Sequence, residues 1–523
     1  MTIPSMTFRH RRMRAPAESG SAFFHPLAQN IHETWNRNQR EIASLELNIA
    51  GKSIQQWRAQ AQQDLVDAAF QYTRQYRDCS TPNSNSTILS GHQPQLFHPG
   101  VWFKNFVLHQ LGRQFDAQPV NLLIDNDLCG VTKIPVPSGS ADQPTIRRVP
   151  FDQGGRLMPF ENRTVNDQTI FENFASETSK TVSPFVNNPL VDRLWPDVLR
   201  ISKQQENLGQ ALAGGRNVLE SEFGIDNLEL PLSQVCQSEV FGVFFHELIG
   251  QADRFFEIYN RVLQEYREFY GIKNRSQPLP DLARVEGYME MPFWIWTDQR
   301  PSRQPLFVKQ TGDLIKLSNL SNIYVELPVN DNSAWHEAFE KYAIRPRALA
   351  TTMFSRLFLC DMFIHGIGGA KYDELTDQIA ESFLNVKLPE YLTSTATIKF
   401  DSPIELLTRQ DLTQYRVTLR EMQYHPEEFV ENPGVLEANL IFAKKQLIEE
   451  FKYPAKRLET YQRVTQINQL LQSALVEKRN WLTNELADER QQLQRARILG
   501  SREYSFCLFD ESLVETMKKL TAI

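Results

Sequence analysis

Hydrophobic positions in the first third of the chain predict an amphipathic helix followed by a strand–helix–strand unit. Between residues 53 and 76, apolar side chains recur every three or four positions, the period of a helix with one buried face. Short apolar runs at 87–89 and 120–124 predict two strands, and residues 101–111 between them have a helical period. Because a crossover through a helix joins parallel strands, this order predicts a parallel sheet in an α/β core.

The middle of the chain mixes helical and strand periods. Large apolar side chains at helical spacing predict one long helix over 240–270, in which the aromatic residues form a packed stripe. Three short apolar runs separated by turn residues then predict a small antiparallel meander. These runs are 291–296, 305–309 and 314–317.

A second strand-to-helix junction follows the meander. The pattern predicts a helix over 348–357, an apolar strand over 358–364, a loop with three glycines within four residues, and a helix over 374–384. Backbone N–H groups in such a glycine-rich loop can face an anion, and the next helix directs the positive end of its dipole at the same place. The pattern therefore predicts a second ligand-binding turn.

From about residue 404 to the end, the chain is predicted to be helical and strongly charged. Across 458–499 leucines and other apolar residues recur at a period of about 3.5 to 3.6, and charged residues and glutamines occupy the other faces. This pattern is typical of a coiled coil or a long helical hairpin. We expect the apolar seam to pair with a second copy of the chain rather than only within one chain.

These patterns divide the chain into three regions. Residues 1–84 are expected to form an N-terminal tail and helix, and residues 85–400 an α/β core with connecting insertions at about 166–330. Residues 401–523 are expected to form the helical arm.

Composition excludes several classes of protein. The net charge is −7, so a global nucleic-acid-binding signature is absent. The apolar runs are too short to cross a bilayer. The five cysteines are scattered without CxxC spacing, which argues against a disulfide framework or a zinc ribbon and favours a reducing compartment, the cytoplasm. No metal-ligand cluster of usual spacing is present.

The first candidate site follows the first predicted core strand. Ser90, Gly91, His92 and Gln93 are followed closely by His98. Glycine allows the backbone to approach a ligand, and the next helix begins here. His92 and His98 are candidate catalytic residues because imidazoles can donate hydrogen bonds to charge that develops on a phosphate. Ser90, Gly91 and Gln93 are candidate binding residues.

Two further segments are expected at the same edge of the sheet, because ligands bind at the carboxyl ends of parallel strands. After the second strand, Asp125 and Asn126 are candidates to hold a substrate amine or a ribose hydroxyl, and Asp127 is a candidate catalytic residue. The glycine-rich segment supplies the remaining candidate binding residues, which are His365, Gly368, Gly369, Lys371, Tyr372 and Asp373.

In this arrangement the chain resembles the bacillithiol-biosynthesis cysteine-adding enzymes. Ser90-Gly91-His92-Gln93, followed by Leu96-Phe97, is similar to the family's Thr-Gly-Gln-Gln…Leu-Phe segment. An acidic turn after the next strand, an Arg-Pro-rich helix, a strand ending in Gly-Gly and a C-terminal coiled coil follow in the family's order. The corresponding segments here are 125–127, 345–347, 368–369 and the helical arm.

The resemblance implies a nucleotidyltransferase-like Rossmann core with inserted segments and a dimerising coiled-coil arm. It also implies a reaction in which the carboxyl group of cysteine is joined to the amine of glucosaminyl malate. Three positions depart from the family pattern. His92 replaces a glutamine, the acidic turn lacks its histidine, and Gly-Gly-Pro-Gly-Glu becomes Gly368-Gly369-Ala370-Lys371-Tyr372 with the acid displaced to Asp373.

Two functions remain open from the sequence. One is a ligase that joins cysteine, or another amino acid, to a small amine in low-molecular-weight thiol biosynthesis. The other is a non-catalytic or differently specific relative that acts as a dimeric binding or scaffold protein. The sequence leaves the cofactor undetermined, with ATP or another adenine nucleotide as a candidate. The expected partners are small-molecule substrates and a second copy of the chain, and neither nucleic acid nor a membrane.

Overall fold

A computed structural model describes residue 8 and residues 13–82, 84–276, 278–329, 331–400, 409–450 and 457–522. Contacts between Cα atoms group the chain into two compact units. Unit 1 comprises Met1–Val136, Arg147–Lys399 and Arg502–Ile523, and unit 2 comprises Pro137–Ile146 and Phe400–Ser501. Residues Arg502–Ile523, which the sequence assigned to the arm, therefore belong to unit 1. Residues 401–408, at the predicted boundary, lie outside the described residues.

Unit 1 is built on a six-stranded sheet of mixed direction. Five neighbouring strands are parallel, as the sequence predicted, and β1 (Ser21–His25) pairs antiparallel with one edge. The strand order is β1, β16 (Leu392–Thr397), β15 (Met362–His365), β4 (Thr87–His92), β5 (Gln118–Leu123) and β8 (Leu228–Pro231). The chain is thus an α/β protein.

The order of the strands reverses at the centre of this sheet. From β4 the chain proceeds to β5 and β8 on one side, and it later adds β15 and β16 on the other side. Helix α3 (Pro99–Gln114) links β4 to β5, and helix α12 (Ile367–Leu384) links β15 to β16. This is the 3-2-1-4-5 order of doubly wound sheets, whose ligands bind where the order reverses. The switch point lies between β4 and β15.

Local sequence determines where helices around the sheet begin. In α2 (Ile54–Thr73), the N-cap Ser53 accepts a hydrogen bond from the backbone N–H of Gln56, whose side chain bonds back to Ser53. This reciprocal capping box stabilises the helix start. The helix covers β8 and β5 with its buried face. The predicted helix over 53–76 is confirmed.

The remainder of unit 1 contains a second sheet and several helices. The predicted meander is confirmed and forms part of an antiparallel sheet. Its strands, in order, are β13 (Tyr324–Pro328), β12 (Leu314–Ser318), β11 (Arg300–Thr311), β10 (Tyr288–Thr297) and β14 (Ala343–Pro346), with β9 (Arg284–Val285) beside β10. Between β5 and β8 the chain forms α4 (Gln168–Val182), α5 (Val191–Gln205) and α6 (Leu208–Glu222), and α7 (Leu232–Val235) follows β8.

Three predicted elements differ from the structure. The single helix over 240–270 is two helices, α8 (Glu239–Gly250) and α9 (Ala252–Tyr270), because Gln251 leaves the helical conformation. The strand over 358–364 begins only at Met362, since residues Ser355–Leu359 continue helix α11 (Ala348–Phe354) as a π-helical turn. A short buried apolar run does not distinguish strand from helix.

The third difference concerns the glycine-rich segment. Helix α12 begins at Ile367, so Gly368 and Gly369 lie in its first turn and not in a loop. Glycine costs a helix only about 1 kcal/mol per residue, and packing of the buried face, which includes Ala370 and Leu375, offsets that cost.

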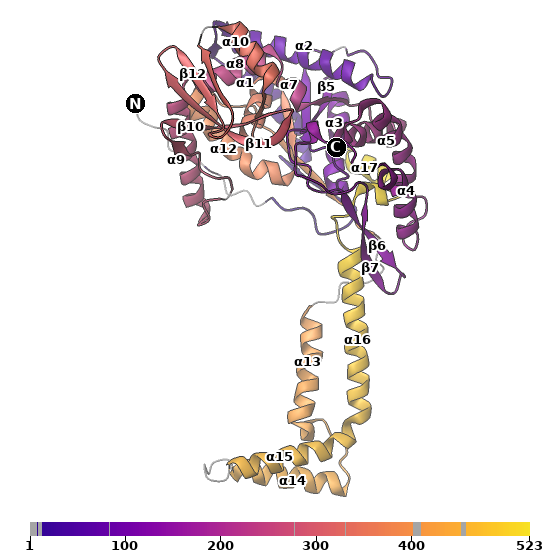
Figure 1. Cartoon of the computed structure of the whole chain (residues 1–523). Helices are drawn as coiled ribbons and strands as arrows, with labels where there is room; N and C mark the ends of the chain where they lie inside the picture. The colour runs from indigo at the N-terminus through magenta and orange to yellow at the C-terminus, as the bar shows by residue number, and fades with distance from the viewer. Residues whose placement is uncertain are drawn as a thin grey trace. The chain divides into compact units, whose positions relative to one another are not determined.

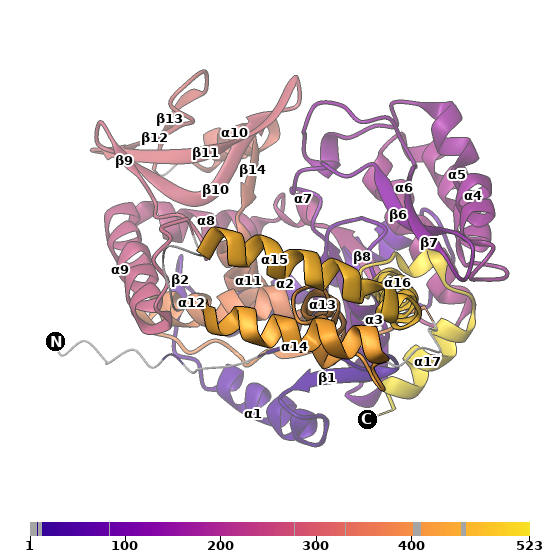
Figure 2. The same cartoon turned by 90° about the horizontal axis from the view of Figure 1, so that it is seen from below.

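Unit 2 contains two pairs of helices and the turn end of the hairpin formed by β6 (Lys133–Gly139) and β7 (Pro144–Pro150). Helices α13 (Arg409–Tyr424) and α16 (Val476–Leu499) pack around Met422 and Leu482. Helices α14 (Val435–Glu450) and α15 (Arg457–Leu471) pack around Leu447 and Ile467 and lie side by side in Figures 1 and 2. The helical period over 458–499 is interrupted by a 3-10 turn at Gln472–Leu475.

Across the described residues, no helix is both long and apolar enough to cross a membrane.

Candidate functional site

A cavity of about 640 Å³ opens at the switch point of the parallel sheet. The strands β4 and β16 supply Gly91, His92 and Thr395 to its wall, and His365 ends β15. The first turns of the two crossover helices supply most of the rest. From α3 and its N-cap come His98, Gly100, Val101 and Lys104, and from α12 and its N-cap come Gly366, Ile367, Gly368, Gly369 and Lys371.

The lining of this cavity is positively charged. Lys104, Lys371, Arg14 and Arg502 all contribute to it, and no carboxylate does among the described residues. Lys104 is buried, and its Nζ donates a hydrogen bond to the carbonyl oxygen of Gly91 over 2.7 Å. Burial, together with the nearby charge of Arg216, lowers the pKa of Lys104 to about 7. Because a bound anion would offset this cost, the cavity favours anionic ligands.

The N-terminus of α12 adds uncompensated backbone donors. No side chain caps this helix, and its N-cap residue is Gly366. The first N–H groups of a helix have no partner within the helix, and the helix dipole makes this end positive. The amides of Ile367, Gly368 and Gly369 therefore form an anion-binding arrangement at the cavity wall.

His98 caps the other crossover helix. Its Nδ1 accepts a hydrogen bond from the backbone N–H of Gly100 over 3.1 Å, and Pro99 occupies the first helical position. Burial lowers the pKa of His98. With Nδ1 acting as an acceptor, the neutral ring carries its proton on Nε2, which lies 3.9 Å from a carboxylate oxygen of Glu503.

His92 has a different arrangement of ring hydrogen bonds from that of His98. Its Nδ1 lies 3.2 Å from the carbonyl oxygen of Gln93, and its ring contacts Phe97 edge-on with centroids 5.2 Å apart. Burial lowers the pKa of His92 to about 3, and the neighbouring Lys104 acts in the same direction. When Nδ1–H donates to Gln93, Nε2 becomes an acceptor. The hydrogen-bond donation expected of His92 therefore requires the other tautomer.

Gln93 connects the cavity to Asp127. Its Nε2 donates to one carboxylate oxygen of Asp127 over 2.8 Å, and Arg303 of β11 forms an ion pair with the other over 2.9 Å. Asp127 does not line the cavity and reaches it only through Gln93. Its carboxylate positions the Gln93 amide beside the ligand space.

Three other predicted site residues form bonds within the fold. Buried Asp125 accepts hydrogen bonds from the backbone N–H and hydroxyl of Ser233 in α7. The Asn126 amide donates to the carbonyl oxygen of Pro346 over 2.8 Å. The Ser90 hydroxyl donates to the carbonyl oxygen of Ile364 across the β4–β15 pair. None of the three lines the cavity, so all three shape the sheet edge around it.

The segment 365–373 divides between the cavity and the core. His365, Gly368, Gly369 and Lys371 line the cavity, whereas Tyr372 is exposed on α12 and Asp373 is buried behind His365. The structure therefore brings together His92, Gln93 and His98 with the start of α12. Gly91 lies with them in the cavity wall.

Two cationic residues of the cavity were not among the site residues predicted from the sequence. Arg502 belongs to the segment after α16, and its guanidinium donates to the Thr395 hydroxyl and the Ala396 carbonyl, both over 3.1 Å. Arg14 comes from a basic N-terminal stretch. Because each lies in a segment remote in sequence from the strand ends, only the fold reveals their place in the site.

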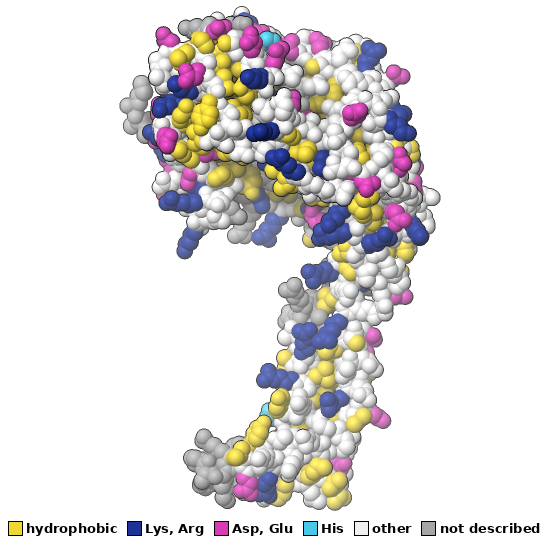
Figure 3. All heavy atoms as spheres, viewed as in Figure 1, with side chains coloured by type: hydrophobic (Ala, Val, Ile, Leu, Met, Phe, Trp, Pro, Cys, Tyr) yellow, Lys and Arg dark blue, Asp and Glu magenta, His cyan; other side chains and the backbone are white. Residues whose placement is uncertain are grey.

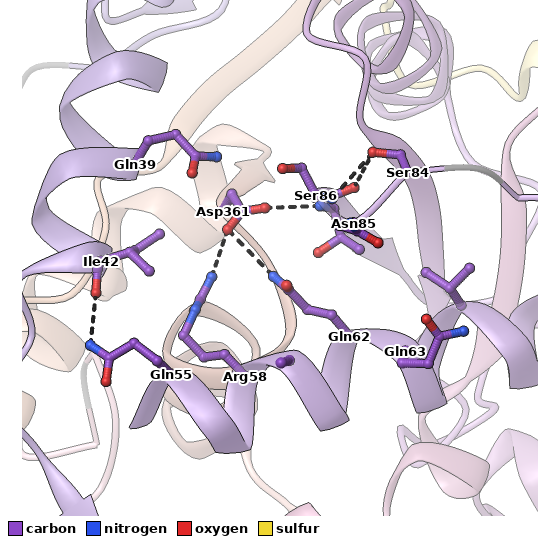
Figure 4. A pocket seen from close by; sticks show the side chains of 13 residues that line it. Gln39, Ile42, Gln55, Arg58, Gln62, Gln63, Ser84, Asn85, Ser86 and Asp361 are labelled. Carbon is purple, nitrogen blue, oxygen red and sulfur yellow. Dashed lines mark hydrogen bonds and ion pairs between the residues drawn. The ribbon is translucent and has the colours of Figure 1, made fainter. Parts of the chain in front are cut away.

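A second cavity of about 510 Å³ lies near the beginning of β4 (Figure 4). Its charged groups neutralise each other, since Arg58 and Asp361 form a buried ion pair over 2.7 Å. Arg58 also donates to the carbonyl oxygens of Leu357 and Cys360, and Asp361 accepts the backbone N–H of Thr87. These bonds hold the sheet against α2. Ligands of doubly wound sheets bind at the opposite, carboxyl end, so the switch-point cavity is the candidate site.

The described residues contain no group of three or more histidine, cysteine, aspartate or glutamate side chains arranged to hold a metal ion. No family model and no curated protein sequence matches the chain.

Proposed function

We propose that the chain is an enzyme that binds an anionic small molecule in the switch-point cavity and joins an amino acid to a small amine. The observation that supports this most strongly is the convergence of an uncapped helix N-terminus with four cationic side chains, without a carboxylate among the described lining residues. Such a wall fits phosphate or carboxylate groups.

The resemblance to the cysteine-adding enzymes supplies the specific form of the proposal. Cysteine, or another amino acid, is the proposed acyl donor, and an amino-sugar conjugate such as glucosaminyl malate is the proposed amine. The strand order 3-2-1-4-5 supports a Rossmann-like core of the nucleotidyltransferase type. The function belongs to the cytoplasm under this proposal.

An adenine nucleotide fits the charge of the site. The amides at the start of α12 with Lys371 and Arg502 would hold its phosphate groups. A bound nucleotide would supply the energy for activating a carboxyl group. The residues of the chain would orient the reactants, and buried Lys104, which donates to the carbonyl oxygen of Gly91, would exclude water from that side of the cavity.

A condensation assay tests the proposal. Purified protein is incubated with cysteine, glucosaminyl malate and ATP, and the products are analysed by mass spectrometry. The proposal predicts a product whose mass is the sum of cysteine and the amine minus one water. Absence of this product from folded protein contradicts the ligase function.

The scaffold alternative has one specific observation in its favour. The carboxylate of Asp127, a candidate catalytic group, is bound to Gln93 and Arg303. If the only role of Asp127 is to hold the Gln93 side chain in position, the chain can bind a small anion without catalysis. In that case the condensation assay fails although anion binding is retained.

We also propose that unit 2 mediates a homodimer. Large apolar side chains are exposed on α14 and α15, and Figure 3 shows yellow side chains on the visible surface of these helices. They are Val435, Leu436, Phe442, Ile448, Leu458, Tyr461 and Leu470. A second copy would bury them. Light scattering is expected to give the dimer mass for the wild type and the monomer mass for Leu436→Glu/Phe442→Glu; a monomeric wild type contradicts this.

Anion binding is expected to weaken as the pH rises through the titration of Lys104. Its pKa is lowered to about 7, so the ammonium group is present below that pH and lost above it. His92 stays neutral throughout because its pKa is about 3. Sulfate, which does not titrate in this range, should bind about tenfold or more weakly at pH 8.5 than at pH 6, the effect of losing one charged hydrogen-bond donor. Calorimetry measures the change, and Lys104→Met should bind weakly at both pH values.

A further inference from the structure

His365 and Asp373 form a hydrogen-bonded pair at the wall of the cavity. The Nε2 atom of His365, at the end of β15, lies 3.0 Å from a carboxylate oxygen of Asp373 in α12. The same carboxylate oxygen pairs with Arg356 over 2.7 Å, and the other accepts the Thr352 hydroxyl over 2.6 Å. The imidazole therefore has a fixed orientation.

The charge of Asp373 determines the tautomer of the neutral ring. Burial opposes ionisation, but Arg356 and His365 beside it hold the pKa of Asp373 well below its ordinary value. An ionised carboxylate only accepts hydrogen bonds, so Nε2 of His365 must carry the proton. The lone pair of the neutral ring then lies on Nδ1.

His365 is buried, and Gly369 leaves room beside its Nδ1 atom. A Cβ atom at position 369 would lie 2.8 Å from Nδ1 of His365, too close for an unbonded contact. At the adjacent Gly368 a Cβ would meet nothing within 4 Å. The requirement for glycine is therefore specific to the position beside Nδ1, and both His365 and Gly369 line the cavity.

We propose that His365 is the general base of this site and that Asp373 is its positioning residue. The proposal deepens the proposed function and rests on it. The group on which His365 acts is the amine nucleophile, and the electrophile is an acyl phosphate, whose leaving group suits the cationic lining of the cavity.

The proposed step transfers the acyl group from the phosphate oxygen to the amine nitrogen. The lone pair of the amine nitrogen forms a bond to the acyl carbon, and the bond from that carbon to the phosphate oxygen breaks with its electron pair on the oxygen. The proton from the nitrogen moves to Nδ1 of His365 and then to the departing phosphate. Asp373 remains ionised and stabilises the transient imidazolium.

The kinetic test uses substitutions of His365, of Gly369 beside its Nδ1 atom, and of its partner Asp373. His365→Ala should lower kcat in the condensation assay by about 100-fold or more, the usual contribution of a general base. The KM for the amine should change less than threefold, and added imidazole should restore part of kcat. Gly369→Ala should also lower kcat, since its methyl group covers Nδ1. Asp373→Asn should lower kcat and alter its pH profile.

Two matched control variants distinguish a loss of kcat caused by removing the general base from one caused by disturbed packing. His246→Ala removes a histidine of α8 that packs on Trp335, away from the cavity, and Gly242→Ala adds a methyl group in the same helix, where nothing lies within 4 Å. Both should retain wild-type kcat. If His365→Ala keeps kcat within threefold of the wild type, or if imidazole restores nothing to folded His365→Ala, the proposal is overturned.

A second measurement does not depend on turnover. In protein labelled with ¹⁵N-histidine, the ring resonances that disappear in His365→Asn identify His365. The proposal predicts a neutral ring protonated on Nε2, with a bare Nδ1 whose resonance shifts when the amine substrate is added. A ring protonated on Nδ1 overturns the proposal. If the wild type makes no product but shows the expected tautomer, the ligase function is contradicted. The proposed arrangement of His365 and Asp373 is then still supported.

Discussion

Replacing Arg216 with methionine is expected to lower the free energy of unfolding by about 3–5 kcal/mol, the cost of leaving buried charges unpaired. Arg216 lies between two buried carboxylates and donates to Glu220 over 2.9 Å and to Glu229 over 2.5 Å. Trp102 and Asn105 of α3 donate to the same oxygen of Glu220. This network therefore connects α6, β8 and α3 in the core below the cavity.

Chemical denaturation at several pH values measures this effect. Burial already raises the pKa of Glu229 in the wild type. Without Arg216, the Glu229 carboxylate would favour its neutral form more strongly, so the folded variant would take up a proton as the pH falls. The deficit in stability should consequently be smaller at pH 5 than at pH 7.

Arg147→Met is the matched control for Arg216→Met. Arg147 is exposed, and its ion pair with Glu177 is also exposed. Such pairs contribute little, so the control should change stability by less than about 1 kcal/mol. A similar loss of unfolding free energy in both variants would show that the buried network contributes no more to stability than an exposed ion pair does.

The second large effect is expected at Gly100, where a single methyl group should destabilise unit 1 by about 1–3 kcal/mol or more. A Cβ at this position would lie 2.4 Å from the carbonyl oxygen of Ala396 and 2.4 Å from a guanidinium nitrogen of Arg502. The Thr395 hydroxyl would be 2.8 Å away. Helix α3 must therefore move away from the backbone of β16, and Arg502 must also leave the cavity wall unless that movement makes room for it.

Thermal unfolding and sulfate binding together distinguish these two responses for Gly100→Ala. A loss of stability with normal binding indicates that the helix moves, whereas a loss of binding indicates that Arg502 is displaced. Gly242→Ala, which has open space around its added methyl group, should be neutral or slightly stabilising. Unchanged stability and binding in Gly100→Ala would contradict the close approach of α3 and β16.

The core of the fold could be predicted because its elements have strong local signals. The run at 87–89, the helical period at 101–111 and the run at 120–124 became β4, α3 and β5. Their order requires a parallel crossover. The position of β1 could not be predicted in this way, because a strand at the edge of a sheet depends on a partner far away in the sequence, here β16.

Candidate site residues were easier to find than their roles. Gly91, His92 and Gln93 follow a strand, and the structure places all three at the cavity. Asp125 has the same kind of position in sequence, but its carboxylate bonds to Ser233 of α7. Sequence position alone does not show which partner a buried carboxylate meets. For the same reason, Asp373 was expected to bind substrate and instead orients His365.

The most direct test of the central claim is a calorimetric titration of pyrophosphate into the wild type and into Lys371→Gln/Arg502→Gln. If the switch-point cavity is an anion site, the wild type binds one pyrophosphate per chain. The double variant should bind roughly 100-fold more weakly, since it lacks two charged donors. Absence of binding to the wild type, or equal affinity in a folded double variant, would contradict the account.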